Sequence, residues 1–401
     1  MAIVVQKYGG SSVADVQRVQ KVADRIAATR RTGQDVVVVV SAMGDTTDDL
    51  LALARRVSAS PSRRELDMLL SAGERIAMAL LSMALNDRGV PAVSFTGSQS
   101  GIITNDAHAA ARIVEVRPYR VQDELARGKV VIVAGYQGVS YRKEITTLGR
   151  GGSDTTAVAL AAALDAEACE IYSDVEGVYS ADPRVVLDAH RLAELSYEEM
   201  QELAEAGARV LNAQAVEFAK LRGIAIYARS SHGGGGETVV RRFPPRAPGR
   251  VVGVASQTQL VQLELRGGAA ELSDLLARLE ARHATGKQLV FGADSRTSLV
   301  LSLDDLPDYA SLADELRREF GENLVLREAV GAVSAIGAGI NTSLGNLRQA
   351  LAALAEAKVR PLGVSTSSFR ISFLLDQSAV ADATRVLHAA LASPAVPVEI
   401  G

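Results

Sequence analysis

Residues 147–156 read Thr-Leu-Gly-Arg-Gly-Gly-Ser-Asp-Thr-Thr, a glycine turn that holds one arginine and runs into an alanine-rich segment. The following residues, 157–164, are strong helix formers, so the glycines lie immediately before a predicted helix. Ser153 and Asp154 are residue types that commonly cap a helix N-terminus. The stretch therefore predicts a turn that leads directly into the start of a helix.

A helix start of this kind is suited to binding an anion. Its unpaired N–H groups carry roughly half a positive charge, and glycines lack the Cβ atoms that would keep a phosphate or carboxylate away. Arg150 adds a planar guanidinium group that matches a carboxylate. The alternative is an ordinary glycine turn before a helix, and motifs elsewhere in the chain are needed to distinguish the two.

The composition indicates a soluble globular protein with two or three domains. The 401-residue chain has a formal net charge of −4 and no tryptophan, whereas a nucleic-acid-binding protein normally carries a basic face with aromatic residues. Cys169, the only cysteine, lies in an apolar run and is expected to be a buried, inert thiol. There is no basic leader and no apolar run long enough to span a bilayer, so we expect a cytoplasmic protein without membrane contact.

Short apolar runs alternate with helical patterns through the first half of the chain. The predicted strands are 3–6, 36–40, 92–95, 130–134, 170–173 and 224–228. Such strands, separated by amphipathic helices, indicate a mainly parallel sheet with helices on both faces. Ligands of these sheets gather at the carboxyl ends of the strands.

Two more loops follow predicted strands in the same way as the arginine turn. Residues 7–12 read Lys-Tyr-Gly-Gly-Ser-Ser, and residues 41–44 read Ser-Ala-Met-Gly. The chain has neither a GxxxxGK[ST] phosphate loop nor a GxGxxG fingerprint after a strand. A bound phosphate would therefore be held in another way than in Walker-type or dinucleotide-binding enzymes.

The C-terminal part contains two similar units of about seventy residues, each with the order strand, helix, strand, strand, helix, strand. A proline-rich connector precedes them. We predict a catalytic domain over 1–240, a linker over 241–256, and the two units over 257–329 and 330–401. Units of this type are common packing or dimerisation modules, and their duplication after an enzyme favours a regulatory ligand site between them.

Three further motifs complete the pattern: 71–75 (Ser-Ala-Gly-Glu-Arg), 135–138 (Gly-Tyr-Gln-Gly) and 173–184 (Ser-Asp-Val-Glu-Gly-Val-Tyr-Ser-Ala-Asp-Pro-Arg). Together with the segments 7–14, 41–44 and 147–156, in this order and spacing, they resemble the aspartate kinase family. The C-terminal units are similar to the tandem ACT domains of that family. The resemblance implies an α/β fold, with a three-layer α/β/α amino-acid kinase domain and two ACT-like βαββαβ domains.

The resemblance also implies transfer of the γ-phosphoryl group of ATP to the side-chain carboxylate of L-aspartate, giving 4-phospho-L-aspartate. An aspartate side chain has a pKa of about 3.9, so the nucleophile is ionised at neutral pH and needs no general base. The reaction instead needs its negative charge neutralised. By the resemblance, Lys7 stabilises the transferred phosphoryl group, and Mg²⁺ arrives with ATP.

The resemblance assigns roles to the aspartate-binding residues as well. Arg150 clamps a carboxylate, Glu74 receives the ammonium group, and Ser41 and Thr47 bond near the reacting carboxylate. The substrate set also includes Gly151, Gly152 and Ser153, and the catalytic set is Lys7, Arg150 and Asp154. From the residues alone, Glu74 can equally stabilise a helix N-terminus, and Asp154 can orient Lys7 or cap its helix.

The predicted ATP-binding residues come from several segments of the catalytic domain. They are Lys7, Tyr8, Gly9, Gly10, Ser173, Asp174, Tyr179, Asp182, Arg184 and Arg209. The 173–184 segment offers groups that suit ribose, adenine and phosphate, and the alternative for it is a polar turn with a proline stop. Arg209 departs from the family, which usually has lysine there, so the affinity for ATP is expected to differ.

The histidines do not predict a metal site formed by the protein alone. His108, His190, His232, His283 and His388 show no paired spacing, and we expect most of them in loops or on the surface.

In the family, ACT domains bind lysine or threonine at their interfaces and inhibit the kinase. The first unit of this chain departs from the family pattern at 266–271, where an Asp-x-Pro-Gly-like turn is usual, and at 291–295, where a Gln-Asn pair is usual. We therefore predict weakened or altered feedback inhibition. ACT units that pair edge to edge also predict a homodimer.

Two other functions remain open. One is a sister amino-acid kinase for glutamate, N-acetylglutamate or a nucleotide monophosphate, and Glu74 and the paired ACT-like units argue against it. The other is a catalytically inactive amino-acid sensor, and Lys7, Arg150 and the complete 173–184 segment argue against it. The product of an aspartate kinase would enter lysine, threonine or methionine synthesis or a related specialised pathway.

Overall fold

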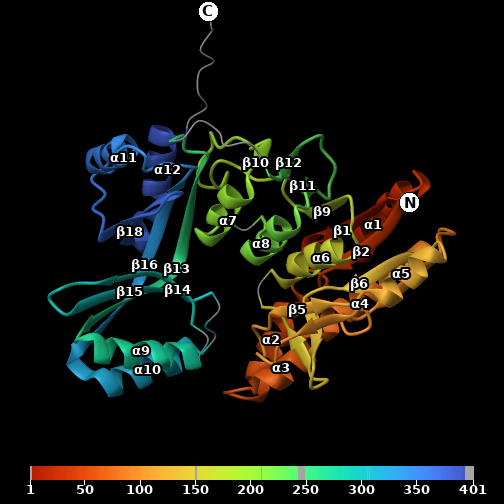
Figure 1. Ribbon diagram of the computed structural model, residues 1–401, viewed down its shortest axis with the longest axis horizontal. Helices are drawn as coiled ribbons and strands as arrows, with labels where there is room; N and C mark the ends of the chain where they lie inside the picture. The colour runs from red at the N-terminus through yellow and green to blue at the C-terminus, as the bar shows by residue number, and fades with distance from the viewer. Residues whose placement is uncertain are drawn as a thin grey trace, which may run out of the picture. The chain divides into compact units, whose positions relative to one another are not determined.

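The structure, a computed structural model, describes residues 2–149, 151–208, 210–242, 249–282, 284–304, 306 and 308–392. The chain forms two compact units, which Figure 1 shows coloured along the sequence. The first comprises the described parts of 1–178, 191–204 and 209–244. The second comprises those of 179–190, 205–208 and 245–401.

The described part of the first unit is built on an eight-stranded sheet. In spatial order its strands are β10 (Glu194–Leu195), β12 (Glu237–Val240), β11 (Ile226–Ser230), β9 (Ala168–Ser173), β1 (Ile3–Tyr8), β2 (Asp35–Val40), β6 (Val130–Ala134) and β3 (Ala92–Phe95). Only β11 and β12 pair antiparallel among these described strands, so the prediction of a mainly parallel sheet is confirmed. The ends predicted for 92–95 and 130–134 are those observed.

Helices cover both faces of this sheet, because its strands are apolar on both sides. On one face Val36 and Val38 pack with Ile26 of α1 (Val16–Arg31) and Leu81 of α4 (Ala72–Asn86). On the other face α6 (Gly152–Ala163) lies over β1, β2 and β9, and α8 (Ala213–Arg222) packs against α6. The three-layer arrangement implied by the resemblance is confirmed.

A smaller sheet lies in the same unit and was missed by sequence reasoning. Its strands, in spatial order, are β5 (Ile113–Val116), β4 (Ile102–Thr104), β7 (Gln137–Ser140) and β8 (Ile145–Thr147). Strands of three or four residues are too short to show a clear alternation of apolar and polar positions. The other elements of this unit are η1 (Gly10–Val13), α2 (Thr46–Val57), α3 (Arg63–Leu70), α5 (Tyr119–Ala126) and α7 (Tyr197–Glu205).

The second unit contains an antiparallel sheet with the order β14 (Gly286–Phe291), β15 (Arg296–Ser302), β13 (Gly253–Arg266), β16 (Leu324–Ile336), β18 (Arg370–Asp376) and β17 (Gly363–Thr366). Its helices are α9 (Ala269–Ala281), α10 (Tyr309–Phe320), η2 (Gly321–Asn323), α11 (Gly345–Glu356), η3 (Gln377–Ala379) and α12 (Val380–Leu391). The helix predicted over 309–320 has the observed ends.

The two long strands β13 and β16 pair along most of their length, so both predicted ACT-like units share one sheet. β13 begins inside the predicted linker 241–256, and the predicted boundary at 329/330 falls inside β16. Register shifts after Gln257 and a left-handed Ala329 (φ +55°) interrupt the alternation of side chains there, and the strands continue through both. The domain limits themselves stay a prediction.

One described helical stretch, Arg63–Asn86, is long and apolar enough to cross a membrane by length and composition alone. This differs from the prediction that no apolar run is long enough to span a bilayer. Half of the stretch is buried inside the structure, and its α4 part packs against α1 and β6, as a core helix of a globular protein does. A single stretch of this kind is weak support for a membrane span.

Candidate active site

Three glycine-containing motifs lie at the carboxyl edge of the parallel sheet, namely 7–12 at the end of β1, 41–44 after β2 and 135–138 after β6. The parallel register sets the ends of β1, β2 and β6 side by side. The following loops remain in contact, because Ser41 N donates to Tyr8 O at 3.1 Å and Gly135 N donates to Val40 O at 3.0 Å. This edge is where ligands of such sheets bind.

The loops after β1 and β2 approach each other so closely that position 10 requires glycine. Gly44 N donates to Gly10 O at 3.1 Å. A Cβ at Gly10 would lie 3.0 Å from the carbonyl oxygens of both Ala42 and Gly44. Because Gly10 has no side chain, the backbones of the two loops can pack directly against each other.

Lys7 and Asp154 form an ion pair at this edge. The distance between Lys7 Nζ and Asp154 Oδ1 is 2.7 Å, and the side chains are only 12% and 9% exposed. Asp154 lies in the first turn of α6, whose N-cap is Gly151, so the expectation that Ser153 or Asp154 caps this helix is wrong. A left-handed residue (φ +74°) ends the turn here instead. Of the two interpretations of Asp154, the geometry favours the one in which it holds Lys7.

Glu74 is a buried acid with one oxygen unsatisfied. It lies in the first turn of α4 and is 2% exposed. Oε1 accepts a hydrogen bond from Ala42 N at 3.2 Å, whereas Oε2 has no hydrogen-bond partner among the described residues. Burial raises the pKa of Glu74 to about 7, against the opposing effect of the backbone N–H groups that it accepts from. A cation at Oε2 would satisfy this carboxylate.

The other predicted aspartate-binding residues lie around the same edge. A Cβ at Gly135 would be 2.8 Å from Ser153 Oγ, so the start of α6 packs against the end of β6. Ser41 follows β2 directly, and Thr47 is half-buried in the first turn of α2. Arg150 lies outside the described residues.

The predicted ATP-binding residues divide into two groups, and the first is in the first unit. A Cβ at Gly9 would lie 3.6 Å from Lys7 Nζ, so Gly9 adjoins the lysine ammonium group. The Tyr8 side chain is fully buried and stacks on Tyr172 with the ring centroids 4.8 Å apart. The ring is thus part of the core, and the ATP-binding role of Tyr8 stays a prediction. Ser173 is half-buried at the end of β9, and Asp174 is exposed.

The second group of predicted ATP-binding residues, Tyr179, Asp182 and Arg184, is in the second unit. Arg184 forms a two-pronged pair with Asp182, with Nη2–Oδ2 and Nε–Oδ1 distances of 2.7 and 3.0 Å. Tyr179 is half-buried. Arg209 lies outside the described residues.

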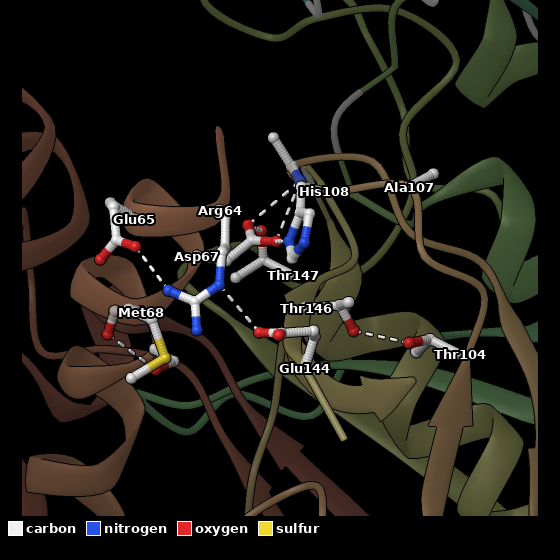
Figure 2. A network of polar contacts seen from close by, with 12 residues as sticks. Arg64, Glu65, Asp67, Met68, Thr104, Ala107, His108, Glu144, Thr146 and Thr147 are labelled. Carbon is white, nitrogen blue, oxygen red and sulfur yellow. Dashed lines mark hydrogen bonds and ion pairs between the residues drawn. The ribbon is translucent and has the colours of Figure 1, made fainter. Parts of the chain in front are cut away.

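Sequence reasoning missed a buried polar network around Asp67, which Figure 2 shows. Asp67 is fully buried on α3, and its Oδ1 accepts from Thr147 Oγ1 at 2.5 Å and from Ala109 N at 3.1 Å. Its Oδ2 lies 2.7 Å from His108 Nδ1. An acid on the buried face of an amphipathic helix, one turn before the 71–75 motif, was the available signal.

Two histidines lie beside one buried hydroxyl, that of Ser180. His388 is buried in α12, with Nε2 2.8 Å from Ser180 Oγ, and His190 Nδ1 lies 3.1 Å from the same hydroxyl. His388 is the described exception to the expectation that most histidines lie in loops or on the surface, and the Ser180 hydroxyl satisfies its ring. His283 lies outside the described residues. Cys169 is buried as predicted, and burial raises the pKa of its thiol.

Comparisons with known proteins agree with this architecture. The amino acid kinase family model matches residues 2–230, and an ACT domain model matches 333–391. Aspartokinases of Mycolicibacterium smegmatis and Corynebacterium glutamicum are 46% and 44% identical to this chain, over 97% of it and 96% of their own length. Escherichia coli aspartokinase III in complex with aspartate and ADP (R-state) matches with a TM-score of 0.85 at 24% identity, over 97% of this chain and 99% of its own. Its complex with lysine and aspartate (T-state) matches with a TM-score of 0.74 at 25% identity, over the same shares.

Proposed function

Because the chain belongs to the amino acid kinase family, and within it to the aspartokinases, we propose that the carboxyl edge of its parallel sheet transfers the γ-phosphoryl group of ATP to L-aspartate. The observation that carries this assignment is Glu74, a buried carboxylate with one oxygen left without a partner among the described residues. An amino acid with a free ammonium group supplies the missing charge. N-acetylated acids do not.

Lys7 neutralises charge on the transferred phosphoryl group. The nucleophile and the phosphate are both anions, so their approach is unfavourable without a fixed cation. The ion pair with Asp154 keeps the Lys7 ammonium at the strand end beside Gly9. No covalent intermediate on the protein is needed, because the aspartate carboxylate attacks the γ-phosphorus directly and ADP leaves.

Mg²⁺ is proposed to bind together with ATP. Within the described residues no group of three or more His, Cys, Asp or Glu side chains could hold a metal ion. In kinase sites Mg²⁺ takes most of its ligands from phosphates and water, with one or two carboxylates from the protein. When bound, it would supply further positive charge to the phosphate oxygens.

The remaining assignments follow the same charges. A carboxylate of aspartate binds at the N-terminus of α6. The groups that receive it are Arg150, Gly151, Gly152 and Ser153. Ser41 and Thr47 hydrogen-bond near the reacting carboxylate. The proposed nucleotide residues of the first unit are Lys7, Tyr8, Gly9, Gly10, Ser173 and Asp174, and Arg209 is proposed with them. Those of the second unit are Tyr179, Asp182 and Arg184, with Arg184 paired to Asp182.

The acceptor panel L-aspartate, N-acetyl-L-aspartate and L-glutamate tests the proposal, with ADP release as the readout. The wild type is expected to use L-aspartate only. Glu74→Gln should raise the KM for aspartate at least about tenfold, because it removes the charge that pairs with the ammonium group. Glu65→Gln, an exposed acid in the first turn of α3, is the matched control and should leave this KM unchanged. Equal use of the N-acetylated acid, or an unchanged KM in Glu74→Gln, would contradict the proposal.

Regulation by an amino acid is proposed to be weak or altered. Gly267 N donates to Ser295 O at 2.9 Å, so the segments 266–271 and 291–295, which both depart from the family pattern, lie together. They border a cavity of about 320 Å³. Its lining includes Arg266, Asp294 and Arg296, charged groups unlike the Gln-Asn pair from which the family's effector response comes.

A homodimer in the cytoplasm is also proposed. The edge strand β14 exposes three consecutive apolar residues, Leu289, Val290 and Phe291, each about half exposed. An apolar edge strand left open is a site for pairing with another chain. A second copy of the chain would cover it by a symmetric contact.

A further inference from the structure

The Asp67 carboxylate joins three segments that are far apart in the chain, as Figure 2 shows. α3 carries Asp67 itself, the turn before β5 carries His108 and Ala109, and the end of β8 carries Thr147. The turn and the strand end are also bonded to each other, because Ala111 N donates to Thr147 O at 2.9 Å. These contacts fix the point at which residues 147–156 leave the small sheet.

Asp67 and Glu74 belong to one helical rod. They are seven residues apart, and Ser71, at the junction of α3 and α4, keeps helical dihedral angles (φ −61°, ψ −12°). Residues i and i+7 of a helix lie on the same face, about 10 Å apart. The rod that places Glu74 beside the 41–44 loop therefore also holds Thr147.

The turn that Asp67 holds lies against the glycine before the proposed substrate arginine. Ala109 has a left-handed φ of +68°, which is unfavourable for a residue with a Cβ, and its amide donates to Asp67. A Cβ at Gly149 would be 3.4 Å from Ala109 O. Removing the carboxylate would let Ala109 relax and the turn shift beneath Gly149.

Tyr136 bonds to both ends of the segment that follows Thr147. Its carbonyl accepts from Leu148 N at 2.9 Å, and its amide donates to Thr156 Oγ1 at 3.2 Å. Burial above all, with the charges of Glu74 and Asp67, raises the pKa of its phenol to about 12, while Thr147 opposes the shift. The Tyr136 backbone therefore ties the turn after Thr147 to the start of α6.

We propose that Asp67 is a positioning residue for aspartate, which holds Thr147 and, through Ala109, Gly149 at a fixed distance from Glu74. The separation between the groups that receive the carboxylate and the ammonium of the substrate then stays fixed. The inference rests on the proposed function and deepens it. Small errors in such a separation are costly to binding and turnover, and they leave the binding of ATP at the Lys7 loop unaffected.

Steady-state kinetics of Asp67→Asn test the proposal, with aspartate and ATP varied separately. The KM for aspartate is expected to rise about tenfold, with the KM for ATP changed less than about twofold. The control is Glu199→Gln in α7, another buried acid that accepts a backbone bond, from Ser196 N at 3.0 Å. It should lower the melting temperature and leave the KM for aspartate unchanged.

Thr147→Val decides the matter if Asp67→Asn does not fold. It removes one donor and should raise the KM for aspartate in the same selective way, to a smaller extent. If Asp67→Asn does fold, its effect and that of Thr147→Val should be less than additive in the double variant, because both act through one contact. Wild-type aspartate kinase activity is measured first. If the folded wild type is inactive, both the proposed function and the inference that rests on it are wrong. With an active wild type, an unchanged KM for aspartate in Thr147→Val, or equal rises in both KM values, overturns the inference alone.

Discussion

At the scale of single residues, two acids at the same sheet edge differ through their partners. Asp154 has Lys7 at 2.7 Å, whereas Glu74 has a backbone amide on one oxygen and no partner on the other among the described residues. The motifs predicted both positions. No motif includes Asp67; the sequence marks it only as an acid on an apolar helix face, and its contacts with Thr147 and His108 arise only in the fold.

The pH dependence of aspartate binding tests the state of Glu74. Since burial raises its pKa to about 7, the free enzyme loses the receiving charge as the pH falls below 7, while the substrate ammonium stays protonated. The KM for aspartate should rise about tenfold between pH 8 and pH 6. Steady-state rates across this range check it, and Glu74→Gln should show a flat profile.

Stability gives an independent check on the same residue. The folded state keeps the Glu74 proton up to about pH 7, whereas the unfolded chain loses it near the ordinary value of 4.5. The acid therefore destabilises the fold increasingly as the pH rises through this window. Glu74→Gln should gain melting temperature relative to wild type from pH 5 to pH 8. A difference that stays constant, or that shrinks, would show that Glu74 is ionised throughout.

At the scale of elements, the strand-turn-helix units were predictable because each combines an apolar run with glycine and a helix-forming segment. The four short strands of the small sheet were not, since three or four residues carry too little pattern. The position of the α6 N-terminus was predicted correctly, but the residue that caps it was not. Gly151, not a side-chain cap, ends the turn.

Gly151→Ala tests the close packing at this helix start. An added Cβ would lie 2.8 Å from Asn212 Cβ, and Asn212 cannot move away without losing its bonds to Gln214 N and Ala215 N at the start of α8. The variant should lose about 2–4 kcal/mol of stability and much of the aspartate kinase rate.

Gly223→Ala is the matched control for backbone strain. Gly223 has a similar φ of +69°, and nothing lies within 4 Å of its added Cβ. It should cost only about 1 kcal/mol in denaturant unfolding. Equal losses in the two variants would mean that strain alone, without the Asn212 contact, explains Gly151.

The β14 edge makes a prediction about assembly. Val290→Lys places a charge on the exposed apolar strand and should convert the proposed dimer into monomer, as measured by light scattering after gel filtration. Leu276→Lys, on an exposed position of α9 in the same unit, should leave the mass unchanged. A dimer that persists in Val290→Lys would place the interface elsewhere.

At the scale of the whole chain, the sequence predicted the catalytic domain and the two ACT-like units. It did not predict that these two units share one sheet through the pairing of β13 with β16. Register shifts and the left-handed Ala329 break the alternation of side chains in these two strands. β13 therefore reads as linker followed by the start of the first ACT-like unit, and β16 reads as the end of that unit and the start of the next. Pairing over long distances in the chain holds these strands together, and no local pattern records it.

The residues that line the cavity of about 320 Å³ depart from the family pattern, so we predict that amino acids inhibit the kinase activity only weakly. Activity with lysine, threonine or both, up to millimolar concentrations, should stay within about twofold of the uninhibited rate. The same assay on an aspartokinase with the usual family pattern provides the positive control. Strong inhibition by either amino acid would show that charged residues such as Arg266 and Asp294 still form an effector site.

The most direct measurement of the central claim is to trap the acyl phosphate with hydroxylamine in the presence of ATP, Mg²⁺ and L-aspartate, and to identify the product by mass spectrometry. The wild type is predicted to form the β-hydroxamate of aspartate. Lys7→Ala should reduce its formation at least about a hundredfold while the fold stays intact. A hydroxamate of another acid, or no hydroxamate from the folded wild type, would contradict the account.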